Sequence, residues 1–273
     1  MDSIIYGILE KQNEGYAKPG DFTNSEGVLI CGKCGEPRTS IKEFPPGSGQ
    51  KKAFPIICRC DEEEEKRYQE RLAEQKRKDR VKLLRRSGIY DTAYSDYTFA
   101  NDDGRNPVLT KKCKKYVEHW EEMADLKCGI VLYGDVGGGK SFFAGCIVNA
   151  LLDKGVPALI TRLSYLVNNR IDKNTPSINL NQFSLIALDD IGAENASQTA
   201  FDIVNDIYLM KIPILLTTNL RLSEMKNPED RERERIYNRL LERAGEKWFV
   251  PVVKSRIDLS RELDRKAKKI LSK

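Results

Sequence analysis

The sequence is poor in histidine and in long apolar runs, and both shortages restrict what the protein can be. Its single histidine, His119, lies in the charged segment 111–122, so we expect a surface residue rather than a metal ligand. No apolar run exceeds about six residues, whereas a membrane-spanning helix needs about 20. The N-terminus carries Asp2 and Glu10 and no basic stretch, which argues against a signal peptide. These absences favour a cytoplasmic protein with no membrane segment.

The 273 residues suffice for one large domain and one small one, and the formal net charge is +5. The basic surplus lies in the terminal segment 254–273. Two interpretations of this segment stay open: a solvated helix, or a surface that contacts nucleic-acid phosphates or an acidic partner. Its basic residues are Lys254, Arg256, Arg261, Arg265, Lys266, Lys268, Lys269 and Lys273.

Composition divides the chain into three parts. Residues 1–60 contain four of the seven cysteines and a middle rich in proline and glycine. Residues 61–88 are almost wholly charged, first acidic and then basic, so we predict an exposed helical linker. In residues 89–273 the predicted strands and helices alternate, which is typical of an α/β domain.

The most specific motif is Gly-Asp-Val-Gly-Gly-Gly-Lys-Ser at 134–141, which matches the phosphate-binding P-loop pattern G-x-x-x-x-G-K-[ST]. The apolar segments 129–133 and 142–152 flank it as a strand and a helix should. Lys140 offers a positive charge to the β- and γ-phosphates, and Ser141 offers a hydroxyl to Mg²⁺, so we predict ATP and Mg²⁺ as cofactors. The predicted nucleotide-binding residues are Gly134, Asp135, Val136, Gly137, Gly138, Gly139, Lys140, Ser141 and Phe142.

Two cysteine pairs predict a zinc site in the first part of the chain. Cys31 and Cys34 form a C-x₂-C pair, and Cys58 and Cys60 form a C-x-C pair after 23 intervening residues. Four thiolates leave no position for water, so we predict structural rather than catalytic Zn²⁺. A disulfide is disfavoured in the reducing compartment of a P-loop ATPase, and packing of free cysteines is the alternative. The remaining cysteines are interpreted as packing residues: Cys113, Cys128 and Cys146.

Two later apolar segments end in polar residues. The strand predicted over 183–190 ends in Asp189 and Asp190; the first carboxylate is placed to hold Mg²⁺, and the second to orient or deprotonate the attacking water. The strand predicted over 213–219 ends in Asn219, which is either a hydrogen-bond partner of the γ-phosphate or the water, or a turn residue. No Asn-Lys-x-Asp motif follows, which argues against a guanine-nucleotide switch, and no acceptor pocket of a small-molecule kinase is indicated.

A helix rich in arginine is predicted over 231–244. Arg235 and Arg239 lie four residues apart on one face. Arginine stabilises a dissociating γ-phosphate, often from a neighbouring subunit, although a helix this charged could also be merely solvated. The opposite, buried face is predicted to consist of Ile236, Tyr237 and Leu240.

Together these motifs resemble bacterial or phage helicase loaders of the DnaC/DnaI type, a branch of the AAA+ ATPases. The resemblance covers residues 87–260, and the cysteine-rich front resembles the helicase-docking domain of the DnaI type. Aromatic residues before the P-loop, which in that family pack near the adenine, are matched as well. The matched segments are the P-loop, Ser87-Gly-Ile-Tyr-Asp91, Tyr97-Thr-Phe99, Asp189-Asp190-Ile-Gly-Ala-Glu194, Thr217-Thr-Asn219 and Arg235-Ile-Tyr-Asn-Arg239.

The resemblance implies a role for each matched residue. Asp189 and Asp190 correspond to Walker B, and Asn219 corresponds to sensor 1. Arg239 corresponds to the arginine finger, and Arg256 corresponds to sensor 2. Asp190 replaces the usual glutamate, and its shorter arm predicts slow hydrolysis unless Glu194 substitutes. The predicted catalytic residues are Lys140, Asp189, Asp190, Asn219, Arg239 and Arg256.

The implied fold is a three-layer α/β P-loop sandwich of the AAA+ type, with a parallel sheet in the order 5-1-4-3-2. Only about twenty residues follow the last predicted strand, so we expect no helical lid. The expected organisation is a zinc-binding, helicase-docking domain over 1–60, a charged helical linker over 61–88 and an AAA+ ATPase domain over 89–273.

The leading hypothesis is an ATP-dependent loader that binds a replicative DNA helicase of the DnaB type and places it on single-stranded DNA. It is expected to be a homo-oligomer when assembled on the helicase. The alternative is an IstB-like ATPase that regulates a transposase on duplex DNA, although such chains generally lack the cysteine-rich front. A nucleotide-switched adaptor with negligible turnover is a third hypothesis, which Asp190 keeps open.

Overall fold

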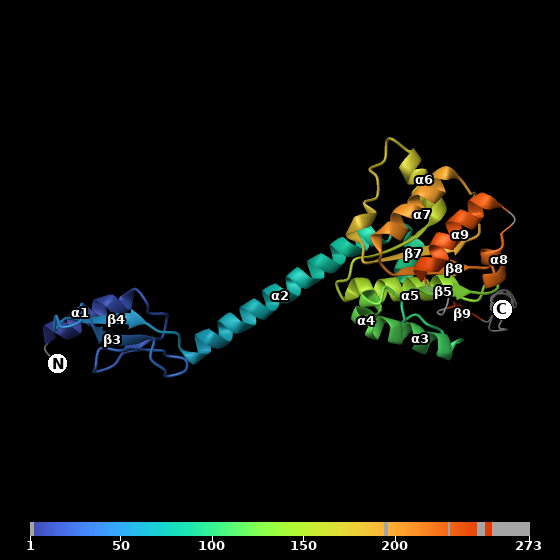
Figure 1. The fold of residues 1–273 in the computed structure, drawn as a ribbon. Coiled ribbons are helices and arrows are strands. Elements are labelled where there is room, and N and C mark those ends of the chain that lie inside the picture. Colours follow the sequence, from blue (N-terminus) through green and yellow to red (C-terminus); the bar gives the residue numbers. More distant parts are fainter. Residues whose placement is uncertain (1–2, 194–195, 229, 245–248, 253–273) are drawn as a thin grey trace, which may run out of the picture. The chain divides into compact units, whose positions relative to one another are not determined.

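The computed structural model describes residues 3–193, 196–228, 230–244 and 249–252 (Figure 1). The chain divides into two compact units, an N-terminal unit over Met1–Lys78 and a C-terminal unit over Asp79–Lys273. The division falls inside the long helix α2 (Arg59–Gly88). Each unit has its own buried core.

The N-terminal unit combines one helix with two short antiparallel hairpins. Its apolar core includes Leu9, Leu29 and Ala53. A polar contact lies beside them, because Thr39 Oγ1 donates to the buried Asn13 Oδ1 at 3.1 Å. So small an apolar core contributes little stability on its own. The elements are α1 (Ser3–Glu14), β1 (Phe22–Thr23), β2 (Leu29–Ile30), β3 (Thr39–Glu43) and β4 (Lys51–Pro55).

The C-terminal unit is built around a five-stranded sheet in which all paired strands run parallel. The strand order is β6-β7-β8-β5-β9. Numbered in chain order from β5 and taken from the other edge, this order is 5-1-4-3-2, as the resemblance implies. The strands are β5 (Ile130–Tyr133), β6 (Ala158–Arg162), β7 (Leu185–Ile191), β8 (Ile214–Thr218) and β9 (Phe249–Pro251).

Helices cover both faces of this sheet and give three layers (Figure 1). Leu132 and Ile160 face the layer of α3, α4 and α5. Their neighbours Val131 and Leu159 face the layer of α6, α7, α8 and α9. Because both faces are buried, the strands are continuous apolar runs. The helices are α3 (Pro107–Glu118), α4 (Trp120–Asp125), α5 (Lys140–Asp153), α6 (Leu163–Ile171), α7 (Gln198–Met210), α8 (Leu222–Lys226) and α9 (Arg231–Ala244), with the short 3₁₀ turns η1 (Thr92–Asp96) and η2 (Leu180–Gln182).

The helix α2 carries the charged segment that the sequence predicts as helical. Near its C-terminal end, Arg85 donates to Asn149 Oδ1 at 2.6 Å and to Asp153 Oδ1 at 2.7 Å, both on α5. Leu84 also packs against the core of the C-terminal unit. The last turns of α2 are therefore anchored to the C-terminal unit.

The residues outside the motifs behave largely as predicted. His119 is exposed, while Cys113 and Cys146 are fully buried packing residues, and Cys128 is half-buried. Among the described residues, no helix is both long and apolar enough to cross a membrane. Several predictions fall outside the described residues, namely those on Glu194, Arg256, the basic segment 254–273 and the helical lid.

Candidate nucleotide site and cysteine cluster

The P-loop joins β5 to α5 at the carboxyl edge of the sheet. α5 begins at Lys140, two residues before the predicted start, directly after Gly139 with its φ of 92°. Gly134 has a φ of 141°, and a Cβ atom there would lie 2.5 Å from the carbonyl oxygen of Val252. Only glycine fits so close to another backbone. The loop thus leads into the N-terminus of α5, where backbone N–H groups favour an anion.

Lys140 holds the P-loop to the neighbouring strand. Its Nζ donates to Gly134 O at 2.8 Å, to Asp135 O at 2.9 Å and to Asn219 Oδ1 at 2.7 Å. Burial lowers the pKa of Lys140 below its ordinary value, and the charge of Asp190 opposes that effect. The predicted phosphate-binding amine therefore lies among the carboxyl ends of β5, β7 and β8.

Asp189 is buried, and each of its carboxylate oxygens accepts a hydrogen bond from a hydroxyl group. Thr217 donates to Oδ1 at 2.6 Å, and Tyr94 donates to Oδ2 at 2.8 Å. Burial, followed by the negative charge of Asp189, raises the pKa of Tyr94 well above its ordinary value, so this phenol keeps its proton. The two donors orient the carboxylate and leave each of its oxygens a further lone pair for a cation.

Asp190 differs from Asp189 in both backbone and exposure. The sequence predicts a strand that ends in the two aspartates, but β7 runs from Leu185 to Ile191, so both lie inside the strand. The pairing with β8 shifts register after Leu188, and Asp190 has a φ of 61°. This bulge turns Asp190 towards solvent, and Asn219 Nδ2 lies 3.5 Å from its Oδ1.

Asn219 therefore connects the two polar groups of the site. Its amide oxygen accepts from Lys140, while its amide nitrogen faces Asp190. The fold thus brings together Lys140, which follows β5, Asp190 of β7 and Asn219, which follows β8. Ser141 is the second residue of α5, and Phe142, the third, packs on Tyr97 with ring centroids 5.6 Å apart. The aromatic segment before the P-loop thus lies against α5.

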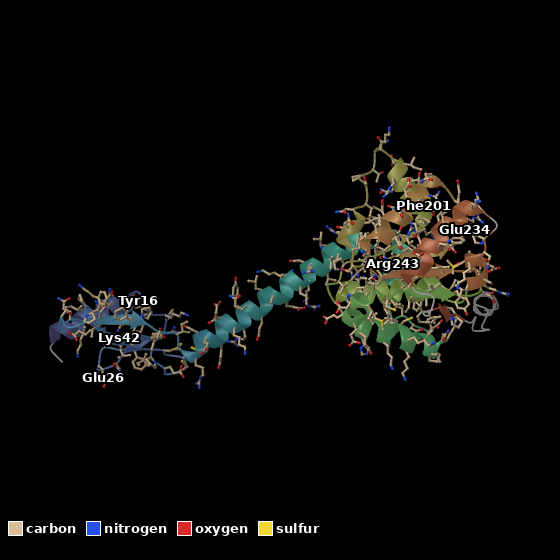
Figure 2. All side chains as sticks on the ribbon, viewed as in Figure 1. Tyr16, Glu26, Lys42, Phe201, Glu234 and Arg243 are labelled. Carbon is tan, nitrogen blue, oxygen red and sulfur yellow. The ribbon has the colours of Figure 1, made fainter. Side chains whose placement is uncertain are left out.

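The structure places the two arginine-finger candidates on the side of α9 that faces α7. The guanidinium carbon of Arg235 lies 3.8 Å from the ring centroid of Phe201, and that of Arg239 lies 4.3 Å from the ring centroid of Tyr208. Figure 2 labels two residues of this region, Phe201 on α7 and Arg243 on α9. Each guanidinium thus stacks on an aromatic ring of α7. The predicted buried face of Ile236, Tyr237 and Leu240 is confirmed.

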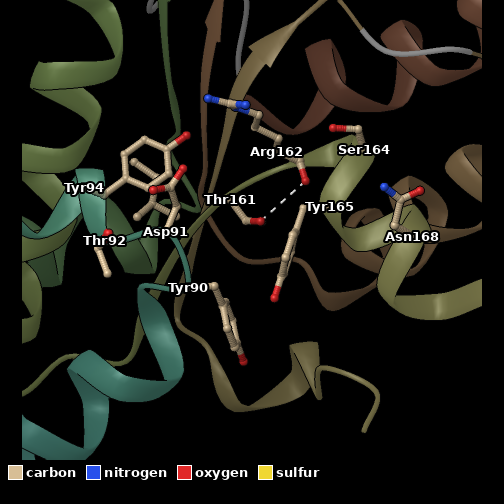
Figure 3. Close-up of a pocket in the computed structure, with 10 residues that line it drawn as sticks. Tyr90, Asp91, Thr92, Tyr94, Thr161, Arg162, Ser164, Tyr165 and Asn168 are labelled. Atoms are coloured by element: carbon tan, nitrogen blue, oxygen red, sulfur yellow. Dashed lines mark hydrogen bonds between the residues drawn. The ribbon is translucent and has the colours of Figure 1, made fainter. Parts of the chain in front are cut away.

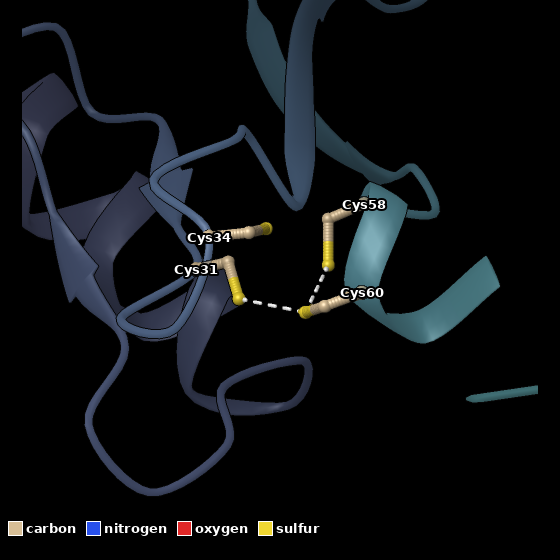
Figure 4. A group of neighbouring side chains, drawn as sticks. All are labelled: Cys31, Cys34, Cys58 and Cys60. Carbon is tan, nitrogen blue, oxygen red and sulfur yellow. Dashed lines mark hydrogen bonds between the residues drawn. The ribbon is translucent and has the colours of Figure 1, made fainter. Parts of the chain in front are cut away.

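The four predicted cysteines meet in the N-terminal unit (Figure 4). Their sulfur atoms all lie within 4.8 Å of one another, and Cys60 Sγ is 3.4 Å from both Cys31 Sγ and Cys58 Sγ. Sulfur atoms at the corners of a regular zinc tetrahedron, with Zn–S bonds of ~2.3 Å, are about 3.8 Å apart. The set of Cys31, Cys34, Cys58 and Cys60 therefore fits a tetrahedral zinc ion.

Hydrogen-bond donors surround the Cys31 sulfur. The backbone N–H of Cys34, and then that of Lys33, lower the pKa of Cys31 to about 6. The buried Arg38 donates from Nη2 to Cys31 Sγ at 3.3 Å. Arg38 also hydrogen-bonds Asp61, and its Nε lies 2.7 Å from a carboxylate oxygen of Asp21. Such donors stabilise thiolates, the form that binds a metal.

Sequence reasoning missed several residues that hold the two sites. Tyr94 and Thr217 fix Asp189, Asn149 ties the turn of Tyr94 to α5, and Arg38 lies beside the cysteines. Thr217 lies in β8, two positions before Asn219 and directly after an apolar run, which was a usable signal. Tyr94, 95 positions from its partner, carries no comparable local pattern.

Comparisons with known proteins give structural likeness without sequence relatives. No family model and no curated protein matches the chain. A solved structure of DnaI is similar at 21% identity and a TM-score of 0.46, over 60% of this chain and 94% of that chain. A DnaC helicase loader is similar at 16% identity and a TM-score of 0.44, over 60% of this chain and 99% of that chain. AMPPCP-bound DnaA from Aquifex aeolicus is similar at 21% identity and a TM-score of 0.42, over 62% of this chain and 55% of that chain.

DnaI and DnaC are names of the loader type that the motifs resemble. Because these TM-scores lie below 0.5, the function proposed for this chain rests on its own residues.

Proposed function

We propose that the C-terminal unit binds ATP with Mg²⁺ and hydrolyses it. The observation that supports this most is the meeting of Lys140, Asn219 and Asp190 at the sheet edge beside the buried Asp189. Lys140 binds the β- and γ-phosphates, and Asn219 orients it towards them. Asp189 and the Ser141 hydroxyl would hold Mg²⁺, which would neutralise negative charge on the phosphate oxygens.

Asp190 is the proposed base for the attacking water. It is exposed, and the bulge in β7 directs it away from the buried Asp189. As the water oxygen bonds to the γ-phosphorus, the bond from that phosphorus to the β,γ-bridging oxygen breaks. ADP leaves with the electron pair, and the proton of the water passes to Asp190. The short side chain makes this step slow.

The N-terminal unit is proposed to bind one structural Zn²⁺. Four sulfur atoms of suitable spacing, next to a buried Arg38, support this assignment. Zinc bound by four thiolates cross-links Cys31 and Cys34 to the start of α2, where Cys60 lies. In a unit with a small apolar core, this link would supply much of the folding free energy.

The whole chain is proposed to be a loader for a replicative DNA helicase of the DnaB type, acting on single-stranded DNA and assembling as a homo-oligomer on the helicase. The loader-type motifs and the separate, cysteine-containing N-terminal unit support this proposal. A division into a docking unit and an ATPase unit suits tethering of a partner.

Two measurements test the function in turn. The first is ATP binding and turnover by the full chain, with and without Mg²⁺ and single-stranded DNA. The second is capture of purified DnaB-type helicase by the full chain and by residues 79–273. This truncation follows the division of the two units and keeps the hydrogen bond from Arg85 to Asn149 of α5. We expect ATP binding by both chains and helicase capture by the full chain alone. Equal capture by both would refute docking through the N-terminal unit and favour the IstB-like alternative, whereas ATP binding without turnover would favour the adaptor.

A further inference from the structure

Tyr94 connects the segment before the P-loop to the buried Asp189. Tyr94 lies on η1, and its hydroxyl donates to Asp189 Oδ2 at 2.8 Å. Both side chains are 4% exposed. The hydrogen bond therefore has few competing water molecules, which makes it strong and well directed.

The two hydroxyl donors of Asp189 come from different parts of the fold. Thr217 lies on β8, the strand next to Asp189, and donates to Oδ1, while Tyr94 approaches Oδ2 from outside the sheet. A carboxylate with a donor on one oxygen alone can still rotate about its Cβ–Cγ bond. Donors on both oxygens fix the plane of the carboxylate, and each oxygen keeps a further lone pair for a ligand.

Contacts with α5 and with Tyr97 hold Tyr94 in place. Asn149 Nδ2 on α5 donates to Tyr94 O at 2.8 Å and to Tyr97 O at 3.0 Å. The rings of Tyr94 and Tyr97 pack edge to face with their centroids 5.8 Å apart. Arg85 of α2 completes the chain of contacts by donating to Asn149. The position of the Tyr94 hydroxyl thus depends on a packed network and not on one rotamer.

We propose that Tyr94 is a positioning residue for Mg²⁺-bound ATP: it holds the Asp189 carboxylate in the orientation that ligates the metal. This inference rests on the proposed nucleotide site. Residues that hydrogen-bond a metal-ligating carboxylate orient it, and their loss weakens metal binding or activity about 10- to 100-fold. Tyr94 touches neither substrate nor the reacting atoms, so it acts through Asp189.

A pocket that Tyr94 helps to line supplies a matched control. This pocket, of about 470 Å³, is lined by Tyr94, Arg162 and Tyr165 among others. In Figure 3 the Tyr94 hydroxyl lies on the same side as the Arg162 guanidinium, whereas the Tyr165 hydroxyl points away from both. Tyr165→Phe therefore removes a hydroxyl group from the same pocket without affecting a contact of Asp189. Tyr94→Phe removes only the hydroxyl that donates to Asp189 and keeps the buried ring.

The test is the affinity of full-length protein for a fluorescent ATP analogue, mant-ATP, in Mg²⁺ and in EDTA. For Tyr94→Phe we expect the gain in affinity from Mg²⁺ to fall about tenfold. Its affinity in EDTA should match that of the unaltered protein, and Tyr165→Phe should change neither value. The Mg²⁺ concentration that half-saturates ATP turnover should rise by a similar factor.

Three outcomes would overturn the inference. An unchanged or larger Mg²⁺ effect in Tyr94→Phe would mean that its hydroxyl does not orient the ligand. An equal loss of affinity in Mg²⁺ and EDTA, or an unfolded variant in a thermal melt, would assign Tyr94 a structural role. Failure of the unaltered protein to bind mant-ATP would instead refute the nucleotide site itself, and the inference with it.

Discussion

Lys140 Nζ lies 2.7 Å from Oδ1 of Asn219, a residue 79 positions later in the chain. This contact joins the P-loop to the end of β8 and sets the direction of the lysine side chain. A lysine without such a partner would keep most of its rotamer freedom, which binding of a phosphate would have to remove.

Replacing Lys140 is expected to remove nucleotide binding. Lys140→Ala deletes a charge-assisted contact to the triphosphate, which is worth about 1.5–3 kcal/mol, so Kd for ATP should rise at least about tenfold. Asn219→Ala should give a smaller rise, because the lysine remains. Isothermal titration of both variants checks this, with the exposed Lys111→Ala on α3 as the control. Wild-type affinity in Lys140→Ala would contradict the phosphate-binding role.

Lengthening Asp190 tests whether its short side chain limits the proposed hydrolysis. Asp190→Glu should raise the rate of ATP turnover if the short carboxylate limits attack of water. Asp tolerates a positive φ better than most residues, so the variant should also lose a little thermal stability at this bulge. Single-turnover hydrolysis and a thermal melt measure the two effects. An unchanged rate would move the role to Glu194 or to a different limiting step.

Zinc content should be one ion per chain in freshly purified protein. Apparent free energies of zinc binding in small sites are about 10–16 kcal/mol and are coupled to folding, so Cys34→Ser should unfold the N-terminal unit. The C-terminal unit should keep its melting transition, because its core is separate. Metal analysis checks the zinc content, with Cys113→Ser as a variant outside the cluster, and calorimetry of Cys34→Ser checks the melting transition. Less than about half an equivalent of zinc would reject the site.

Arg239 is expected to act on a neighbouring subunit. A mixture of Arg239→Ala and Lys140→Ala proteins should regain ATPase activity, because each contributes the half-site that the other lacks. The Arg239 guanidinium stacks on Tyr208 of its own chain, so it must leave this ring to reach a neighbour's phosphate. Turnover as a function of mixing ratio is the measurement. If the mixture stays inactive while both proteins associate, Arg239 is structural and Arg235 is the next candidate.

Asn149 should be worth more to stability than an ordinary surface asparagine. Asn149→Ala leaves the carbonyl groups of Tyr94 and Tyr97 without their side-chain donor and leaves Arg85 without one acceptor. The Tyr94 carbonyl keeps the backbone N–H of Tyr97 as a donor at 3.2 Å, so at roughly 1–3 kcal/mol for each buried polar group left unpaired we expect a loss of about 1–3 kcal/mol in the free energy of unfolding. Chemical denaturation checks this against Asn168→Ala, an exposed control. A loss no larger than that of the control would show that the turn holds without Asn149.

The parts that sequence predicts well are those with a local pattern. The P-loop, the cysteine spacing and the period of α9 each lie within a short window, and the structure shows Cys31 beside Cys60 and Ile236 buried. The contact of Tyr94 with Asp189 depends instead on how η1 packs over the sheet, which no short window contains. The bulge at Asp190 was missed for the same reason, since pairing with β8 determines it.

The close approach of Gly134 and Val252 has a mechanical consequence. The backbone of Val252 is bonded to the end of β5 through Tyr133 O at 2.8 Å, and it leaves no room for a side chain on the first glycine of the P-loop. A movement of the P-loop backbone at Gly134 therefore requires Val252, the residue directly after β9, to move with it.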